Sequence, residues 1–195
     1  MDVWYVSYGS NLAAARFGCY LSGGTPAGAR RAMTGCRDAR PPRRWRPTEL
    51  PWRLRFGGES TVWGGGVAYL DLDRPGTTYA RAWRITVGQF ADVIAQENDL
   101  ACGTVDVDTA LLAAGGALFP GESYGRVVPL PTLEGIPAVT FTCAELPPHR
   151  PPSPAYRSTM RTGLLELSLP DVDVDAYLDA AASGVHGEPT TTGEA

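Results

Sequence analysis

The first segment of the chain has the hydrophobic pattern of a strand that runs into a tight turn. Residues 3–8 are mostly β-branched or aromatic, which is typical of a strand. They are followed by Gly9-Ser10-Asn11, residue types that favour a turn, and then by residues 12–21, which suit a short helix. We therefore expect a strand, a turn and a helix in immediate succession.

Two further pairs of strands are predicted downstream. Residues 64–72 and 78–86 are separated by Asp73-Arg74-Pro75-Gly76, a turn signal, so they are expected to form a hairpin. Residues 125–130 and 136–143 are expected to form a second pair of the same kind. Both pairs would be antiparallel, because a short turn joins only antiparallel neighbours.

The segment 87–99 has the clearest helical spacing in the chain. Thr86 and Gln89 are placed as a capping box, and Ile85 and Phe90 occupy the two positions of a hydrophobic staple. A helix that begins at residue 87 is therefore expected.

The C-terminal part of the chain adds two predicted helices and a polar end. The helices are expected at residues 153–165 and 173–182, and residues 184–195 are expected to form a disordered tail. Strands thus predominate in the first two thirds of the chain and helices at its end, an order that predicts an α+β fold rather than alternating β-α-β units. Residues 1–183 are expected to form a single domain.

An arginine-rich segment, residues 29–55, interrupts this pattern. It carries nine arginines and four prolines, too many helix breakers for a long helix, and is expected to be a surface excursion that ends in a strand at 52–56. Arginines interleaved with Trp45 are also found in nucleic-acid-binding proteins. The formal net charge of −4 and the lack of a known nucleic-acid-binding pattern favour instead a solvated segment that borders a site.

The amino-acid composition excludes or disfavours several classes of enzyme. All 17 basic residues are arginine, so neither a lysine Schiff base nor the lysine of a phosphate-binding loop is available. The four cysteines are far apart and only two histidines are present, which gives little material for a metal centre or a Ser-His-Asp triad. We expect no metal, no cofactor and no membrane segment, since the apolar runs are shorter than the ~20 residues that cross a bilayer. A cytoplasmic location is expected, and the sequence does not indicate an oligomeric state.

Glu97 is the most informative single residue in the predicted helix. Phe90, Val93, Ile94 and Glu97 follow one another at helical spacing, so the glutamate lies on the apolar face. A desolvated carboxylate has a raised pKa and exchanges protons near neutrality, which makes Glu97 a candidate general acid and base. The structural alternative, that Glu97 caps the helix or pairs with an arginine, stays open at this point.

The turn Tyr8-Gly9-Ser10-Asn11-Leu12 is the second candidate for a site. Between a strand and a helix, it is placed to present backbone N–H groups to an anion or a developing oxyanion. Its structural alternative is an ordinary turn in which Ser10 or Asn11 is a helix N-cap. Ser10 is not expected to be a nucleophile, because it lacks the GxSxG spacing and a histidine partner.

Taken together, these segments resemble the gamma-glutamylcyclotransferase family, and the resemblance spans most of the chain. It rests on the YGSN turn after the first strand, on a hairpin and a glutamate late in the helix that follows this hairpin, and on the Pro-Ser-x-x-Tyr helix start that contains Tyr156. Further similarities lie at residues 50–56, 65–68 and 82–85. The sequence departs from the family after Glu97, where asparagine stands in place of the glycine often found there.

The resemblance implies a mixed, mostly antiparallel sheet curled into a small barrel, with helices packed outside. It also implies which residues form the site. Glu97 would be the proton-transfer residue, Gly9, Ser10, Asn11 and Leu12 the loop that holds a glutamyl group, and Tyr8 and Tyr156 pocket-lining residues.

The implied reaction is an intramolecular cyclisation. The α-amine of a γ-glutamyl amide attacks the γ-carbonyl, which releases 5-oxoproline and a free amine without a cofactor. The expected partner is therefore a small-molecule γ-glutamyl substrate. The alternatives are an enzyme that processes another γ-glutamyl or acyl amide on the same fold, a non-catalytic binding module and, least favoured, a nucleic-acid binder that uses the arginines from Arg30 to Arg55.

Overall fold

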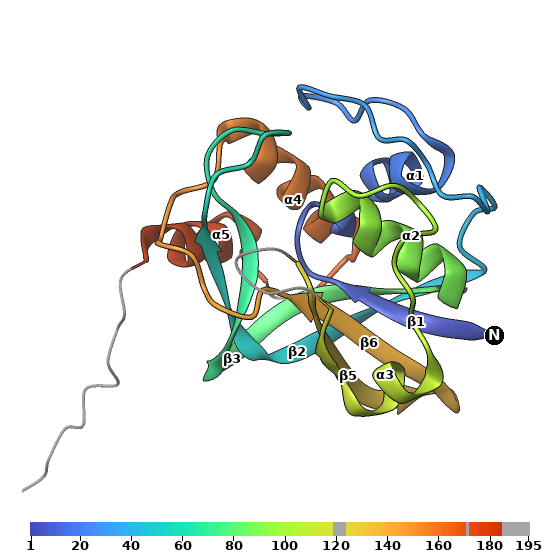
Figure 1. Ribbon diagram of the computed structural model, residues 1–195. Helices are drawn as coiled ribbons and strands as arrows, with labels where there is room; N and C mark the ends of the chain where they lie inside the picture. The colour runs from blue at the N-terminus through green and yellow to red at the C-terminus, as the bar shows by residue number, and fades with distance from the viewer. Residues whose placement is uncertain (119–123, 171, 185–195) are drawn as a thin grey trace, which may run out of the picture.

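The computed structural model describes residues 1–118, 124–170 and 172–184 and has a mixed six-stranded sheet with helices packed against it (Figure 1). The predicted α+β class is confirmed. The strands are β1 (Asp2–Ser7), β2 (Arg44–Gly57), β3 (Val67–Thr86), β4 (Gly116–Ala117), β5 (Arg126–Leu133) and β6 (Ile136–Thr142). The helices are the 3-10 turn η1 (Ser10–Leu12), α1 (Ala14–Ser22), α2 (Val87–Glu97), α3 (Thr109–Ala114), α4 (Pro154–Glu166) and α5 (Val174–Ser183).

The sheet is open rather than closed into a barrel. Its strand order is β2-β3-β1-β6-β5-β4, and β1 and β6 form a parallel pair among antiparallel neighbours. The predicted barrel is therefore wrong, because β2 and β4 lie at opposite edges of the sheet and β4 has only 2 residues with which to form a ladder. Pro47 and Pro51 lie in β2, where an edge strand tolerates the loss of their N–H groups.

The predicted hairpin around residues 73–76 is also wrong, because β3 continues straight through this turn signal. β3 pairs with β2, and the register shifts between the pair Leu50–Thr78 and the pair Arg53–Asp71. Two residues of β2 thus lie opposite six residues of β3, so the turn-forming sequence is absorbed as a bulge. β2 begins at Arg44, eight residues before the predicted strand, and the arginine-rich excursion is correspondingly shorter.

The other predicted elements are confirmed with small changes at their ends. The capping box of α2 is present, with Gln89 N–H donating to Thr86 Oγ1 at 3.1 Å and Thr86 N–H donating to Gln89 Oε1 at 3.0 Å. Helix α2 ends at Glu97 rather than at residue 99, since Asp99 has a left-handed φ of 56°. Helix α3 and strand β4 were not predicted. The predicted disordered tail, residues 184–195, lies outside the described residues except for Gly184, which is the C-cap of α5.

Because β1 is shorter than β3, the first half of β3 has a strand neighbour on one side only. β1 pairs with β3 only from Thr86 back to Arg81, so the first half of β3 is bonded to β2 alone. Side chains take the place of the missing strand in the described structure. Ala68 N–H donates to the Tyr156 hydroxyl at 3.2 Å, the Tyr124 hydroxyl donates to Ala68 O at 2.7 Å, and Leu70 N–H donates to Thr142 Oγ1 at 3.1 Å.

Helix α4 supports the turn that follows β1. Figure 1 shows α1, α2 and α4 grouped above the strands, and α4 contacts η1 directly. The contact depends on Gly163, because a Cβ atom there would lie 2.4 Å from Ala13 N and 2.5 Å from the carbonyl carbon of Leu12. Among the described residues, no helix combines the length and apolarity needed to span a bilayer.

A methyl group at position 163 tests this packing. Gly163→Ala must push α4 away from the turn, so we expect it to lower the unfolding free energy by ~1–3 kcal/mol in urea denaturation. Gly18→Ala is the matched control, since Gly18 is also helical but a Cβ there would meet nothing within 4 Å. The control is expected to be neutral or to gain up to ~1 kcal/mol of stability. Equal losses in the two variants would contradict the close contact.

Candidate functional site

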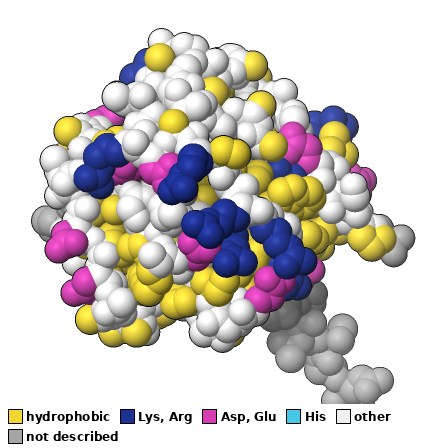
Figure 2. Space-filling view, turned by 90° about the vertical axis from the view of Figure 1, so that its right-hand side faces the viewer, with side chains coloured by type: hydrophobic (Ala, Val, Ile, Leu, Met, Phe, Trp, Pro, Cys, Tyr) yellow, Lys and Arg dark blue, Asp and Glu magenta, His cyan; other side chains and the backbone are white. Residues whose placement is uncertain are grey.

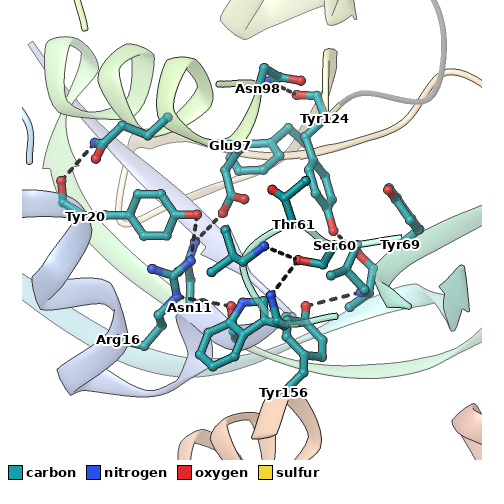
Figure 3. Close-up of a pocket in the computed structure, with 18 of the residues that line it drawn as sticks. Asn11, Arg16, Tyr20, Ser60, Thr61, Tyr69, Glu97, Asn98, Tyr124 and Tyr156 are labelled. Atoms are coloured by element: carbon teal, nitrogen blue, oxygen red, sulfur yellow. Dashed lines mark hydrogen bonds between the residues drawn. The ribbon is translucent and has the colours of Figure 1, made fainter. Parts of the chain in front are cut away.

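A cavity of about 240 Å³ lies past the end of β1, beside the first half of β3. Its wall is formed by the end of β1 and the turn after it, by the first half of β3, by the end of α2 and by the start of α4 (Figure 3). The cavity therefore occupies the side of β3 on which β1 no longer reaches it. Most of the candidate residues line it, namely Tyr8, Gly9, Ser10, Asn11, Glu97 and Tyr156.

Glu97 points into this cavity from the last turn of α2. Asn11 Nδ2 donates to Glu97 Oε1 at 2.9 Å (Figure 3). The Tyr20 hydroxyl faces the same carboxylate and lowers its pKa. Among the described residues Glu97 forms no ion pair with an arginine, and the cap of α2 is the Asn98 backbone. In the described structure Glu97 therefore neither caps the helix nor pairs with an arginine, and the structural alternative is wrong.

The environment of Glu97 favours its protonated form. Burial raises the pKa of Glu97 above its usual range, and the charge of Asp99 adds to this effect. The charge of Arg16 and the hydrogen bonds from Tyr20 and Asn11 act in the opposite direction without cancelling it. A carboxyl group with a raised pKa is suited to accept and return a proton near neutral pH.

Asn11 connects the turn after β1 to this carboxylate. Its side chain lies between the Tyr5 hydroxyl, at 3.3 Å, and Glu97. Its backbone oxygen accepts hydrogen bonds from Ser7 Oγ and Trp83 Nε1, both at 3.0 Å. No side-chain cap is formed at the start of η1 or α1, so the N-cap alternative for Asn11 and Ser10 is wrong.

Tyr156 holds the same turn from the other side. Its hydroxyl accepts from Ala68 N–H at 3.2 Å, and burial raises the pKa of Tyr156 to about 12. The hydroxyl packs so closely on Gly9 that a Cβ at that position would lie 2.8 Å from it. The phenol is thus neutral at physiological pH and fixes the turn against β3.

Leu12 departs from the expected pattern. Its side chain is fully buried and does not line the cavity. The N–H groups of Leu12 and Ala13 are used inside the turn, donating to Gly9 O at 3.0 Å and to Ser10 O at 3.2 Å. The expectation that Leu12 contacts a ligand is therefore corrected, because its side chain and its amide serve the turn itself.

Sequence reasoning missed Arg16, Tyr20 and Trp63, which also line the cavity. Arg16 and Tyr20 are one turn apart on the buried face of α1, next to Phe17. A charged residue within an apolar helical stripe was the signal that identified Glu97, and it was equally present at Arg16. Trp63 comes from the loop between β2 and β3, where no local pattern marks it.

The arginine-rich segment is largely neutralised by acidic neighbours. Ion pairs join Arg37 to Asp92 at 3.0 Å and Arg44 to Glu134 at 3.2 Å, and Figure 2 shows basic and acidic side chains next to one another over one face of the molecule. Arg31, paired with Asp99, lines the cavity, so this segment does border the site. In the described part of the chain, no group of three or more His, Cys, Asp or Glu residues is placed to hold a metal ion.

The stability of Glu97→Gln should depend on pH. Because the pKa of Glu97 is raised on folding, its ionised form costs stability, and this cost appears as pH rises above the unfolded-chain value of ~4.3. Glu97→Gln removes the cost, so we expect a melting temperature above the parent's at pH 7–8 and equal to it near pH 4. For a chain of this length, ~1 kcal/mol corresponds to ~2–4 °C. Glu49→Gln, on the exposed part of β2, should show no such trend, and a pH-independent difference for Glu97→Gln would contradict the raised pKa.

Gly9 and Tyr156 should be energetically coupled. Gly9→Ala places a methyl group against the Tyr156 hydroxyl and is expected to cost ~1–3 kcal/mol. Tyr156→Phe leaves Ala68 N–H without its acceptor and is expected to cost a similar amount. In the double variant the clash is gone. Its loss of unfolding free energy should therefore be ~0.5–3 kcal/mol smaller than the sum of the losses in the two single variants. Urea denaturation of the four proteins measures this difference, and strict additivity would contradict the contact.

Comparisons with known proteins give one relative in sequence and several in structure. The protein named histone deacetylase 5 of Arabidopsis thaliana is 39% identical over 212 residues, an alignment that covers 94% of this chain. The chain spans only 31% of the length of that protein. No protein-family model matches the chain.

The solved structures share the fold over the whole chain at low sequence identity. A gamma-glutamyl cyclotransferase covers 100% of this chain and 93% of its own, with a TM-score of 0.55 and 19% identity. An uncharacterized protein from Homo sapiens covers 99% of this chain and 92% of its own, with a TM-score of 0.56 and 20% identity. YkqA from Bacillus subtilis covers 93% of this chain and 55% of its own, with a TM-score of 0.53 and 17% identity. The chain therefore has the gamma-glutamyl cyclotransferase fold.

Proposed function

We propose that the protein cleaves a γ-glutamyl amide by cyclising the glutamyl group to 5-oxoproline and releasing the amine. The observation that carries this proposal is the placement of Glu97, a carboxylate with a raised pKa that points into a cavity and accepts a hydrogen bond from Asn11 of the YGSN turn. The fold shared with a gamma-glutamyl cyclotransferase supports it.

The reaction requires a group that transfers protons but no nucleophile from the protein. The substrate's α-ammonium, whose free pKa is ~8, gives a proton to Glu97 and becomes a nucleophilic amine. The amine nitrogen then forms a bond to the γ-carbonyl carbon, while the bond from that carbon to the leaving nitrogen breaks. Glu97 returns this proton to the leaving nitrogen, and the ring nitrogen gives up its second proton to the released amine, which departs as an ammonium ion, so Glu97 ends in its starting form. Since the attack is intramolecular, an effective concentration of ~10⁵ M or more contributes to the rate once the substrate is held in the right shape.

The turn after β1 is proposed to hold the glutamyl group. Gly9, Ser10 and Asn11 line the cavity beside Glu97, with Tyr8 and Tyr156 completing that part of the wall. Leu12 would act only as a support for the turn. No metal or organic cofactor is required, because the substrate supplies the nucleophile and Glu97 carries the proton.

The size of the cavity favours a small substrate. Its volume of about 240 Å³ lies below the ~300–1,000 Å³ typical of ligand pockets. The glutamyl end would fill the inner part beside Glu97, and the amine half would point towards the exposed rim of the cavity, where the Arg31–Asp99 ion pair lies. A small-molecule γ-glutamyl amide is therefore the proposed partner.

A second candidate is the processing of another acyl amide in the same cavity. The name of the relative in sequence, histone deacetylase 5, refers to removal of an acetyl group from a protein, which is also an amide-cleaving reaction. The chain matches less than a third of that protein's length, so this reading has less support than cyclisation. A non-catalytic binding role would not use the raised pKa of Glu97.

Release of 5-oxoproline from a panel of γ-glutamyl amides tests the proposal. We expect the purified protein to react with at least one of them, and Glu97→Gln, which keeps the shape but cannot transfer the proton, to lose ~10²–10⁴-fold in rate. Glu49→Gln is the matched control, since it removes an exposed carboxylate away from the cavity and should keep full activity.

The panel should also contain an acetyl-lysine peptide from a histone. Acetate release from this peptide, with no 5-oxoproline from any γ-glutamyl amide, would replace cyclisation by the second candidate. A protein that is folded but releases neither product would leave a binding role as the remaining reading.

A further inference from the structure

Arg16 is a buried cation for which the fold provides no ion pair in the described part of the chain. It is 3% exposed and lies on α1 among apolar residues. Its guanidinium carbon lies 4.2 Å from the centre of the Tyr20 ring and 5.4 Å from that of Trp63. Aromatic faces compensate only part of the cost of burying a charge, so an arginine buried at this position lowers stability unless its charge has a further use.

The polar contacts of Arg16 lead towards Glu97. Arg16 Nη2 donates to the Tyr20 hydroxyl at 2.9 Å, and Arg16 Nε donates to Ser10 Oγ at 3.5 Å. A hydroxyl that accepts a bond from a guanidinium keeps its own proton for another acceptor. For Tyr20 the acceptor in that direction is the Glu97 carboxylate, which the hydroxyl faces across the cavity (Figure 3) and whose pKa it lowers.

A second contact, made by Gln96, fixes the distance between α1 and α2. Gln96, the neighbour of Glu97 on α2, donates from Nε2 to the backbone oxygen of Tyr20 at 3.0 Å. Its Oε1 accepts from Gly35 N–H at 3.0 Å, so the amide group is held at both ends. Helix α1 is therefore bonded to α2 one residue before Glu97, and the Tyr20 hydroxyl has a fixed place relative to the carboxylate (Figure 3).

We propose that Arg16 is a positioning residue that acts through the Tyr20 hydroxyl to fix the orientation of the Glu97 carboxylate and to keep its ionised form available. This inference rests on the proposed role of Glu97 in proton transfer. Arg16 does not itself touch the reacting atoms. It sets the direction of the Tyr20 proton, and the charge it carries offsets part of the cost of a buried carboxylate.

The other groups that face Glu97 do not duplicate this effect. Burial raises the pKa values of the surrounding tyrosines, so these residues stay neutral while Glu97 titrates. Asp99 carries a negative charge and raises the pKa of Glu97, whereas Arg16 lowers it. The titratable and charged groups concerned are Tyr5 on β1, Arg16 and Tyr20 on α1, Asp99 after α2, Tyr124 before β5 and Tyr156 on α4.

The test is to follow the ionisation of Glu97 itself by carboxyl ¹³C NMR in protein labelled at glutamate, with the resonance assigned by its loss in Glu97→Gln. Tyr20→Phe keeps the ring under Arg16 and removes only the hydroxyl. Arg16→Met removes the charge and keeps much of the bulk. Both should move the Glu97 titration to higher pH, because each removes an interaction that favours the ionised form. Arg16→Lys, which keeps a charge, should restore part of the shift.

Activity should follow the same shift. The acid limb of the pH profile of kcat for 5-oxoproline release is expected to move upwards with the titration, each unit lowering the ionised fraction tenfold on that limb. Arg81→Met is the matched control, since Arg81 is 1% exposed and also lies over two aromatic rings but is not part of the cavity wall. It should lower stability and leave the Glu97 titration in place.

The outcomes separate this inference from the proposed function. An unchanged Glu97 titration in both Tyr20→Phe and Arg16→Met would overturn the positioning role even in an active enzyme. A shifted titration in a protein that forms no 5-oxoproline would keep the positioning role and remove the cyclotransferase proposal. Should Arg16→Met fail to fold, Arg16→Lys takes its place, because lysine cannot reproduce the fork of donors; a Glu97 titration identical to the parent's in Arg16→Lys, or an unchanged one in Tyr20→Phe, would then overturn the positioning role.

Discussion

β1 is much shorter than β3, and the backbone groups exposed by this difference must find partners other than a strand. Tyr124, Thr142 and Tyr156 supply those partners along the first half of β3. A side chain reaches further than a neighbouring backbone does, so the strand and the rest of the sheet are held apart where a ladder would have drawn them together. The cavity is the space that results, and two of the three side chains that hold it open, Tyr124 and Tyr156, also form its wall.

The polar groups that line the cavity destabilise the folded protein. Glu97 is a carboxylate whose pKa is raised by burial, Arg16 is a cation without an ion pair in the described structure, and Arg16 Nη1 and Asn11 Oδ1 lack hydrogen-bond partners there. An unsatisfied buried group costs ~1–3 kcal/mol, and apolar residues of similar size would avoid the cost. Such costs are typical of residues kept for activity rather than for stability.

The sequence predicted this site where the signal was local. Helical spacing alone put Glu97 on the apolar face of α2, and the capping box fixed where that helix begins. The same reasoning applied to α1 would have found Arg16. Trp63 and Tyr124 had no comparable signal, because each enters the cavity from a loop whose path depends on contacts far away in the chain.

The errors in the fold have the same origin. The residues at 73–76 have the composition of a turn, and nothing nearby shows that β3 has a partner, β2, long enough to carry it past them. The barrel was expected from a family resemblance, whereas closure depends on the length of the edge strands, and β4 is too short to reach β2. Local chemistry thus predicts which residues are suited to react, while the lengths of strands that pair at a distance decide where the sheet opens.

The turn after β1 belongs to the fold and to the proposed chemistry at the same time. The Asn11 backbone is bound by Ser7 and Trp83, which keeps the turn at the end of β1, and its side chain meets Glu97. The close approach of Gly163 to this turn leaves α4 no freedom to move without moving the turn as well. The geometry around Glu97 is therefore set by packing on three sides, from β1, α1 and α4, and a substrate would meet a site that is already formed.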